Sequence, residues 1–179
     1  MAIKTFVLEN YPEKEKRHAA IEKAIKEYLE NDKAEVLYTS KGKPYIKGTP
    51  TEKFLSVTTT GTVMLCVFSD MPIGIDGEHL GRFGPDNKTD YQVLADRFFT
   101  EEEAEYVRDG DGDPMRFVRV WVRKEAYVKL TGKGLSDFSN FSVTDGERFY
   151  TKVNGVPIKK FSINFPGSSE YIFAIAGVE

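Results

Sequence analysis

The sequence contains a single cysteine, Cys66, among its 179 residues. One cysteine cannot form an internal disulfide, and Cys66 lies within the apolar run 63–68. We therefore expect it to be buried as a small hydrophobic residue. No histidine is close to it in the sequence, which disfavours a catalytic thiol.

The chain also lacks long apolar segments and any strong excess of charge. No apolar run approaches the ~20 residues of a membrane span, and no apolar signal region opens the chain. The net charge of -3 argues against nucleic acid as the main partner. We therefore expect a cytoplasmic protein that binds neither membrane nor nucleic acid, and its 40% hydrophobic and 30% charged residues predict a folded core.

The first part of the chain has the pattern of several strands and one helix. Within residues 13–30, Ile21, Ala24, Ile25 and Tyr28 form one apolar stripe at helical spacing. A turn is expected at 41–44. Strands are expected at 3–8, 35–39, 54–60, 62–68 and 73–77.

The second part begins after a polar loop at 81–90, which divides the chain into expected halves 1–80 and 81–179. Helices are expected at 91–99, from Thr100, where Glu103 completes a capping box, and from Asp113 to about Thr131. Strands are expected at 141–144, 148–152, 157–164 and 171–176. This order predicts an α+β fold with helices packed on mostly antiparallel sheet.

The helix from Asp113 carries an anomaly. Its apolar stripe runs through Phe117, Trp121 and Val128, yet the same spacing also includes Lys124 and Glu125. Burying a charge is costly unless it is paired or bound to a metal. Two explanations stay open at this point: a snorkelling lysine beside a partly exposed glutamate, or a functional pair. The exposed face is expected to hold Arg116, Arg119 and Arg123.

Two acidic residues at the end of the strand 73–77 suggest a cation site. Residues two apart on a strand face the same side, so Asp76 and Glu78 present two carboxylates together. Hard oxygen ligands of this kind suit Mg²⁺, and the alternative is an acidic turn in solvent. Glu125 and the lysines at 124, 129 and 133 add a third carboxylate and phosphate ligands. That combination is typical of phosphoryl transfer.

These residues also form a family pattern. The segments Gly-Ile-Asp-Gly-Glu at 74–78, Trp-Val-Arg-Lys-Glu-Ala-Tyr-Val-Lys at 121–129 and Gly-Lys-Gly-Leu at 132–135 occur in order. Phe98-Phe99-Thr100 and Gly42-Lys43-Pro44 add two weaker matches, and the similar region covers about residues 15 to 145. The chain resembles the 4′-phosphopantetheinyl transferase superfamily, in its larger, two-halved class.

The resemblance implies two similar α/β halves, related by a pseudo-twofold axis, with a cleft for coenzyme A between them. It implies transfer of the 4′-phosphopantetheine arm of coenzyme A to a serine of an acyl or peptidyl carrier protein. Adenosine 3′,5′-bisphosphate would be released. It further implies a monomeric enzyme that depends on Mg²⁺, with Mn²⁺ as the alternative metal.

The resemblance also implies roles for individual residues. The metal ligands would be Asp76, Glu78 and Glu125, and the catalytic residues would be Glu125, Asp76 and Lys129. Contacts with coenzyme A would come from Lys43, Thr58, Thr59, Lys124, Lys129 and Arg17. The base that accepts the serine proton is either Glu125 or a metal-bound water.

Two positions depart from the family pattern. Thr59 stands where the family has a histidine that meets the 3′-phosphate, so a positive charge is missing. Gly77 stands where a bulky aliphatic residue is usual, and glycine loosens a strand. These departures favour one alternative, a degenerate relative that binds coenzyme A or a carrier without transfer. A Mg²⁺-dependent phosphatase acting on a nucleotide is a further alternative.

Overall fold

The computed structural model describes residues 3–9, 14–40, 42–84 and 86–179. Residue 13 at the expected helix start, Lys41 in the expected turn and Pro85 in the polar loop lie outside the described residues. None of the helices in the described ranges is long and apolar enough to cross a membrane.

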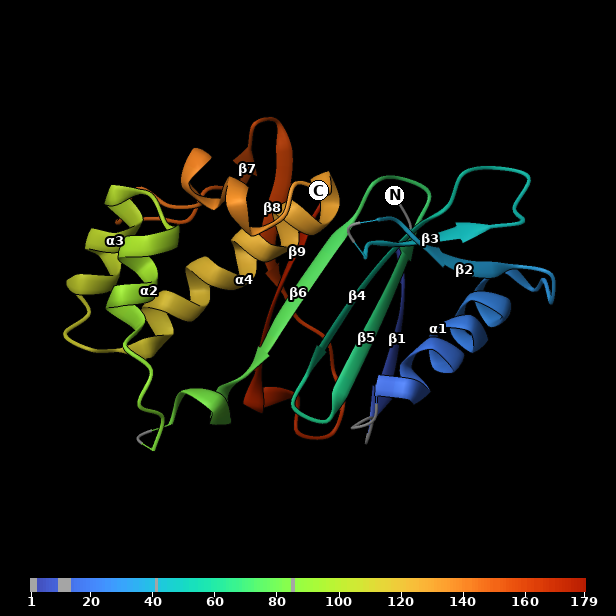
Figure 1. Cartoon of the computed structure of the whole chain (residues 1–179), viewed down its shortest axis with the longest axis horizontal. Coiled ribbons are helices and arrows are strands. Elements are labelled where there is room, and N and C mark those ends of the chain that lie inside the picture. The colour runs from blue at the N-terminus through green and yellow to red at the C-terminus, as the bar shows by residue number, and fades with distance from the viewer. Residues whose placement is uncertain (1–2, 10–13, 41, 85) are drawn as a thin grey trace.

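The N-terminal part is a three-stranded antiparallel sheet with one helix on its face (Figure 1). The strands, in spatial order, are β1 (Ile3–Glu9), β5 (Val63–Ser69) and β4 (Phe54–Thr60). Helix α1 (Lys14–Leu29) buries the predicted stripe against Met64, Cys66 and Phe68 of β5. Cys66 is buried as expected, and burial raises the pKa of its thiol to about 12.

A small hairpin lies beside this sheet. It pairs β2 (Glu35–Tyr38) with β3 (Pro44–Lys47). The sequence predicts β2 but not β3, which is short and buries only Ile46 on its apolar face. Tyr45 stays 44% exposed, so the segment shows little of the alternation that signals a strand.

The C-terminal part is a second antiparallel sheet, in the order β6-β9-β8-β7. Its strands are β6 (Gly74–His79), β9 (Tyr171–Ala176), β8 (Val156–Phe161) and β7 (Lys152–Val153). β6 pairs with β9 along its whole length, so a division at residue 80 would separate β6 from its own sheet. Along the chain, the last strand of the first sheet is β5 and the first strand of the second sheet is β6, so the change of sheet comes before the polar loop.

Helix α4 (Pro114–Thr131) packs on this second sheet, and α2 (Tyr91–Phe98) and α3 (Glu101–Arg108) lie at its far end (Figure 1). The predicted helix signals are confirmed. Asp113 caps α4 by accepting from the Met115 amide, and Gly132 ends it with a φ of 76°. Thr100 and Glu103 form the capping box of α3.

The segment between α4 and β7 differs from its prediction. The expected strands at 141–144 and 148–152 reduce to one bridge between Thr144 and Phe149 and to the two residues of β7. Short 3₁₀ helices occur at Leu80–Phe83, Leu135–Asn140 and Ser168–Glu170. The mixed helices and antiparallel sheets confirm the α+β class, whereas the pseudo-twofold relation stays a prediction.

The two sheets meet through a shared core. Leu65 and Val67 of β5 pack against Ile75 of β6 and against Phe173 and Ile175 of β9. β4 and β6 lie side by side where the sheets meet, yet they belong to separate hydrogen-bonded sheets (Figure 1). We call this β4–β6 contact the seam.

Candidate active site at the seam

A close approach of β6 to α4 sets the geometry of the seam. A Cβ atom on Gly74 would lie only 2.0 Å from the Ala126 carbonyl oxygen of α4. Only glycine permits this spacing, because any side chain would collide with helix backbone. The approach brings Asp76, two residues further along β6, within reach of Lys129, one turn further along α4.

Side-chain hydroxyls of β4 join the two strands. Ser56 accepts a hydrogen bond from the Ile75 amide at 3.0 Å, and Thr58 donates to Asp76 Oδ1 at 3.1 Å. Thr60 donates to Glu78 Oε2 at 3.3 Å. Alternate residues of a strand share a face, so one serine and two threonines point together at β6. The hydroxyls thereby fix both acidic side chains.

Asp76 is the most buried of the three acidic residues at the seam, with 7% of its surface exposed. Lys129 Nζ lies 2.7 Å from its Oδ1 and also donates to the Val57 carbonyl oxygen at 3.3 Å. The other carboxylate oxygen, Oδ2, is buried without a hydrogen-bond partner. A buried carboxylate oxygen without a donor is unfavourable, so Oδ2 has the capacity to take a cation or a donor from a ligand.

Glu78 is held from two sides. Arg82 Nη1 lies 2.6 Å from its Oε2, opposite the Thr60 hydroxyl. Burial raises the pKa of Glu78 above its usual value, with Asp76 adding to the rise and Arg82 opposing it. The two acidic residues of β6 therefore act on one another electrostatically, as their spacing predicts.

Glu125 of α4 belongs to the same electrostatic group. Burial raises its pKa to about 7, and the negative charges of Asp76 and Glu78 add to the rise while Lys129 opposes it. Like charges in a poorly solvated site disfavour the ionised form of each carboxyl group. A cation among them would relieve this repulsion.

The donor set fits a hard cation such as Mg²⁺ by its chemistry. It offers carboxylate oxygens only, and one of them, Asp76 Oδ2, is buried and unpartnered. Across the described ranges, no three His, Cys, Asp or Glu side chains are already gathered at metal-binding spacing. Lys129 and Arg82 instead neutralise Asp76 and Glu78.

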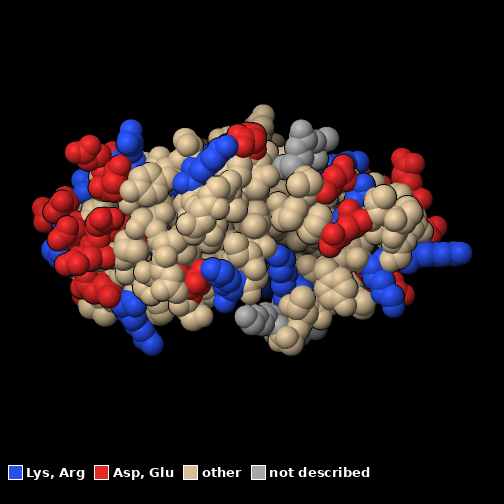
Figure 2. All heavy atoms as spheres, turned by 90° about the horizontal axis from the view of Figure 1, so that it is seen from above, with Lys and Arg blue, Asp and Glu red and all other residues tan. Residues whose placement is uncertain are grey.

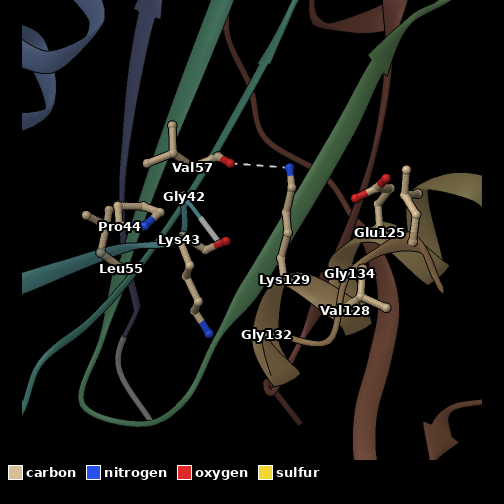
Figure 3. A pocket seen from close by; sticks show the side chains of 12 residues that line it. Gly42, Lys43, Pro44, Leu55, Val57, Glu125, Val128, Lys129, Gly132 and Gly134 are labelled. Atoms are coloured by element: carbon tan, nitrogen blue, oxygen red, sulfur yellow. Dashed lines mark hydrogen bonds between the residues drawn. The ribbon is translucent and has the colours of Figure 1, made fainter. Parts of the chain in front are cut away.

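A pocket of about 300 Å³ opens beside these residues. Figure 3 shows Lys43 and Val57 on one wall and Glu125, Val128 and Lys129 of α4 on the other. Lys43 Nζ donates to the Leu130 carbonyl oxygen at 2.7 Å, and burial lowers the pKa of this lysine. The pocket is therefore flanked by two lysines and one glutamate, from both parts of the chain.

Lys124 requires a correction. It is fully buried, its Nζ lies 2.7 Å from Glu103 Oε2, and it donates to the carbonyl oxygens of Phe138 and Phe141. Its ammonium group thus lies inside the C-terminal core and not in the pocket. Neither a snorkelling lysine nor a contact with coenzyme A phosphates fits this position.

Only some of the other residues predicted to contact coenzyme A line the pocket. Lys43 and Lys129 line it, whereas Thr58 points its hydroxyl at Asp76. Thr59 lies on the opposite face of β4, partly exposed and outside the pocket lining. Arg17 of α1 also lies outside the lining, with its buried Nε unpartnered.

Residues that the sequence reasoning missed are Ser56 and Thr60, which hold β6 in place. Their signal was the spacing Ser-x-Thr-x-Thr at 56–60, which predicts three hydroxyls on one strand face. The departure at Gly77 is also explained, because the Phe173 ring covers it: a Cβ there would lie 2.0 Å from Phe173 Cδ1. Gly77 and Phe173 are direct cross-strand partners.

Comparison with known proteins supports the pattern. The profile of the 4′-phosphopantetheinyl transferase superfamily matches residues 72–176. The chain is 30% identical over 128 residues to 4′-phosphopantetheinyl transferase Sfp of Bacillus subtilis, which covers 69% of this chain and 54% of that protein. It is 32% identical over 111 residues to 4′-phosphopantetheinyl transferase HetI of Nostoc sp., and this match covers 59% of this chain and 45% of that protein.

A similar protein from Bacillus pumilus, 4′-phosphopantetheinyl transferase psf-1, is 31% identical over 97 residues, or 53% of this chain and 38% of that protein. The chain thus spans about half the length of these relatives, or less. The matched profile covers more than half of the chain and includes β6 and α4, which carry Asp76, Glu78, Glu125 and Lys129. The chain therefore belongs to the 4′-phosphopantetheinyl transferase superfamily.

Proposed function

We propose that this chain transfers the 4′-phosphopantetheine arm of coenzyme A to a serine of an acyl or peptidyl carrier protein. The observation that carries the proposal is the convergence of Asp76, Glu78 and Glu125 with Lys129 beside the pocket at the seam. Carboxylates for a cation next to lysines for phosphates are what a diphosphate substrate requires. The proposal includes a cytoplasmic monomer without a nucleic-acid partner.

Coenzyme A would bind with its phosphates between the two walls of the pocket. Lys43 and Lys129 supply positive charge there, and both now donate to backbone carbonyl oxygens that a phosphate can replace as acceptors. We propose that Arg17 and Thr59 contact more distant parts of the ligand. Thr59 offers a hydroxyl without the charge of the family's histidine.

Asp76, Glu78 and Glu125 would hold Mg²⁺, or Mn²⁺ in its place. Such an ion, when bound, neutralises the charge of the diphosphate and orients it for attack. Lys129 and Arg82, which now pair with two of these carboxylates, would then turn toward phosphate or toward the carrier.

The reaction forms one bond and breaks one. The carrier serine oxygen attacks the phosphorus next to the pantetheine arm, and the bond from this phosphorus to the bridging oxygen of the diphosphate breaks. Adenosine 3′,5′-bisphosphate leaves with that oxygen. Glu125 lies beside the pocket and is our candidate to accept the serine proton, and a water held at the site is the alternative base.

The carrier would dock where positive charge is exposed near the acidic strand. Arg82 and Lys88 lie in the loop after β6, and Arg97 is exposed on α2. The α2–α3 end of the molecule is strongly acidic in Figure 2, because α3 exposes Glu101, Glu102 and Glu105. The acidic residues of α3 would repel an acidic carrier, which favours docking at the 82–88 loop and at α2 over docking at α3.

Release of adenosine 3′,5′-bisphosphate tests this function. Coenzyme A and Mg²⁺ are incubated with the chain, with and without an apo carrier protein, and the nucleotide is quantified by chromatography. We expect release only when the apo carrier is present. Release without a carrier would support the phosphatase alternative.

The degenerate relative gives a third outcome. Thr59 favours it, because the family's charged histidine is missing at that position. Calorimetric binding of coenzyme A combined with no release, for several unrelated carriers, would overturn the transferase proposal in its favour.

A further inference from the structure

A second pocket, of about 390 Å³, lies on the other flank of α4. Met115, Arg119 and Arg123 of α4 line it at successive turns, together with Lys160 of β8 and Tyr171 of β9. At 3.6 residues per turn, these helix positions lie away from the face that carries Glu125 and Lys129. The two pockets share no lining residue.

Arg123 is the unusual group in this second pocket. Only 9% of its surface is exposed, and its guanidinium carbon lies 3.9 Å from the centre of the Phe149 ring. Nη1 donates to the Arg119 carbonyl oxygen at 2.8 Å. Within the described part of the chain, no carboxylate pairs with it, although buried charges usually have a counter-ion.

Burial lowers the pKa of Arg123 to about 10, and the charge of Arg119 adds to this effect while Tyr106 opposes it. A guanidinium group carries five N–H donors in a planar fork. One of them engages a backbone carbonyl oxygen, so the group retains donors for a ligand.

Two more cations face the same space. Arg119 and Lys160 are exposed at the pocket, and neither forms an ion pair with another described residue. The lining contains no aspartate or glutamate. Three positive charges gathered without an acid repel one another, and an anion between them would remove that repulsion.

Apart from Ser169, the remaining walls are apolar or aromatic, and they include Met115, Phe149 and Ile172. A ligand here therefore needs an anionic end and an apolar body. We propose that this pocket binds a phosphate monoester whose other part is apolar or aromatic. An arginine guanidinium group can donate two parallel hydrogen bonds to the oxygens of one phosphate. Three cations also favour a phosphate dianion over a carboxylate, which carries one charge. This site is independent of the proposed transfer reaction.

Phenyl phosphate is a suitable probe. It is titrated into ¹⁵N-labelled protein, and amide chemical shifts are followed by NMR. We expect saturable shifts at residues 119–123, 160 and 172. Benzoate keeps the ring but carries one charge, and inorganic phosphate lacks the ring. We expect each of them to bind about tenfold more weakly than phenyl phosphate, because each loses one good charged or apolar contact.

Variants on one strand provide the matched control. Lys160→Gln and Lys159→Gln remove the same charge from adjacent residues of β8, which face opposite sides of the sheet. We expect Lys160→Gln and Arg119→Gln each to weaken phenyl phosphate binding about tenfold, and Lys159→Gln to leave it unchanged. Because Arg119 and Lys160 are exposed, their replacement leaves the core intact.

Several results would overturn the assignment. One is a titration in which only amides near Lys43 and Lys129 respond, and another is equal weakening by Lys159→Gln and Lys160→Gln. If benzoate bound more tightly than phenyl phosphate, the site would not select a phosphate group. If inorganic phosphate bound as tightly as phenyl phosphate, the site would not recognise an apolar part of the ligand. Shifts produced by an apo carrier protein but not by phenyl phosphate would make this surface a protein contact instead.

Discussion

Lys124 and Glu103 form an ion pair that is completely buried between α4 and α3. Glu103 also accepts from the amides of Thr100 and Val143, so both of its oxygens are satisfied. The sequence marks Lys124 as anomalous and explains Glu103 as a capping residue, but it does not connect them. The connection depends on how two helices pack, which residue spacing within one helix does not reveal.

Replacing Lys124 by methionine should destabilise the fold. The change leaves the Glu103 carboxylate buried without its cation, and breaking such a pair typically costs about 3–5 kcal/mol. Urea unfolding of Lys124→Met measures the loss. The double variant Lys124→Met/Glu103→Gln should recover part of it, because no buried charge then remains. A single variant within about 0.5 kcal/mol of the parent chain, the range of neutral surface changes, would contradict this account.

Gly77 is required by its cross-strand partner. A Cβ at this position would lie 2.0 Å from Phe173 Cδ1, so Gly77→Val forces the ring out of the shared core. Overpacking of this kind typically costs about 1–3 kcal/mol. Thermal unfolding should show that loss, and a Phe173→Ala background should shrink the effect of Gly77→Val. Equal effects in both backgrounds would mean that the ring is not the cause.

At the level of elements, helices were more predictable than strands. α4 begins and ends where Asp113 and Gly132 predict, because caps are local signals. The segment 141–152 has β-type residues but forms mostly bends and irregular backbone, and Glu103 and Lys124 take up the backbone groups of Val143 and Phe141. Tertiary contacts thus override local preference there.

The seam is an element contact that local patterns only partly predict. The sequence places Asp76 and Glu78 on one face of β6, and it indicates Glu125 and Lys129 as their companions. It does not show that β4 supplies the hydroxyls, because the fold, and not a hairpin, brings β4 and β6 side by side. The sequence also does not predict that Asp76 forms an ion pair with Lys129, or that Glu78 forms one with Arg82.

Thr58 and Thr59 test the seam as a matched pair. Thr58→Val removes the hydroxyl that donates to Asp76, whereas Thr59→Val changes a partly exposed neighbour on the opposite face of β4. Losing a buried hydrogen bond to a carboxylate typically costs about 1–3 kcal/mol. We expect urea unfolding to show this loss for Thr58→Val and a change within about 0.5 kcal/mol for Thr59→Val. The reverse order would contradict the described orientation of β4.

On the scale of the whole molecule, the site exists only because two sheets share a core. Lys43 and the hydroxyls of β4 come from the first sheet region, and Glu125 and Lys129 come from the helix on the second. The pocket is lined by residues from both parts of the chain (Figure 3), and that it is the cleft for coenzyme A expected from the family resemblance stays a prediction. The boundary was expected at residue 80, because a polar loop was the strongest local signal, while the pairing of β6 with β9 is set by distant residues.

The central claim is that the carboxylates at the seam support transfer to a carrier. The most direct test is the intact mass of an apo carrier protein after incubation with this chain, coenzyme A and Mg²⁺. Glu125→Gln is the test variant, and Glu27→Gln, on the exposed side of α1, is the matched control. The account predicts a gain of one phosphopantetheine with the parent chain and with Glu27→Gln, and none with Glu125→Gln. An equal gain with Glu125→Gln would contradict it.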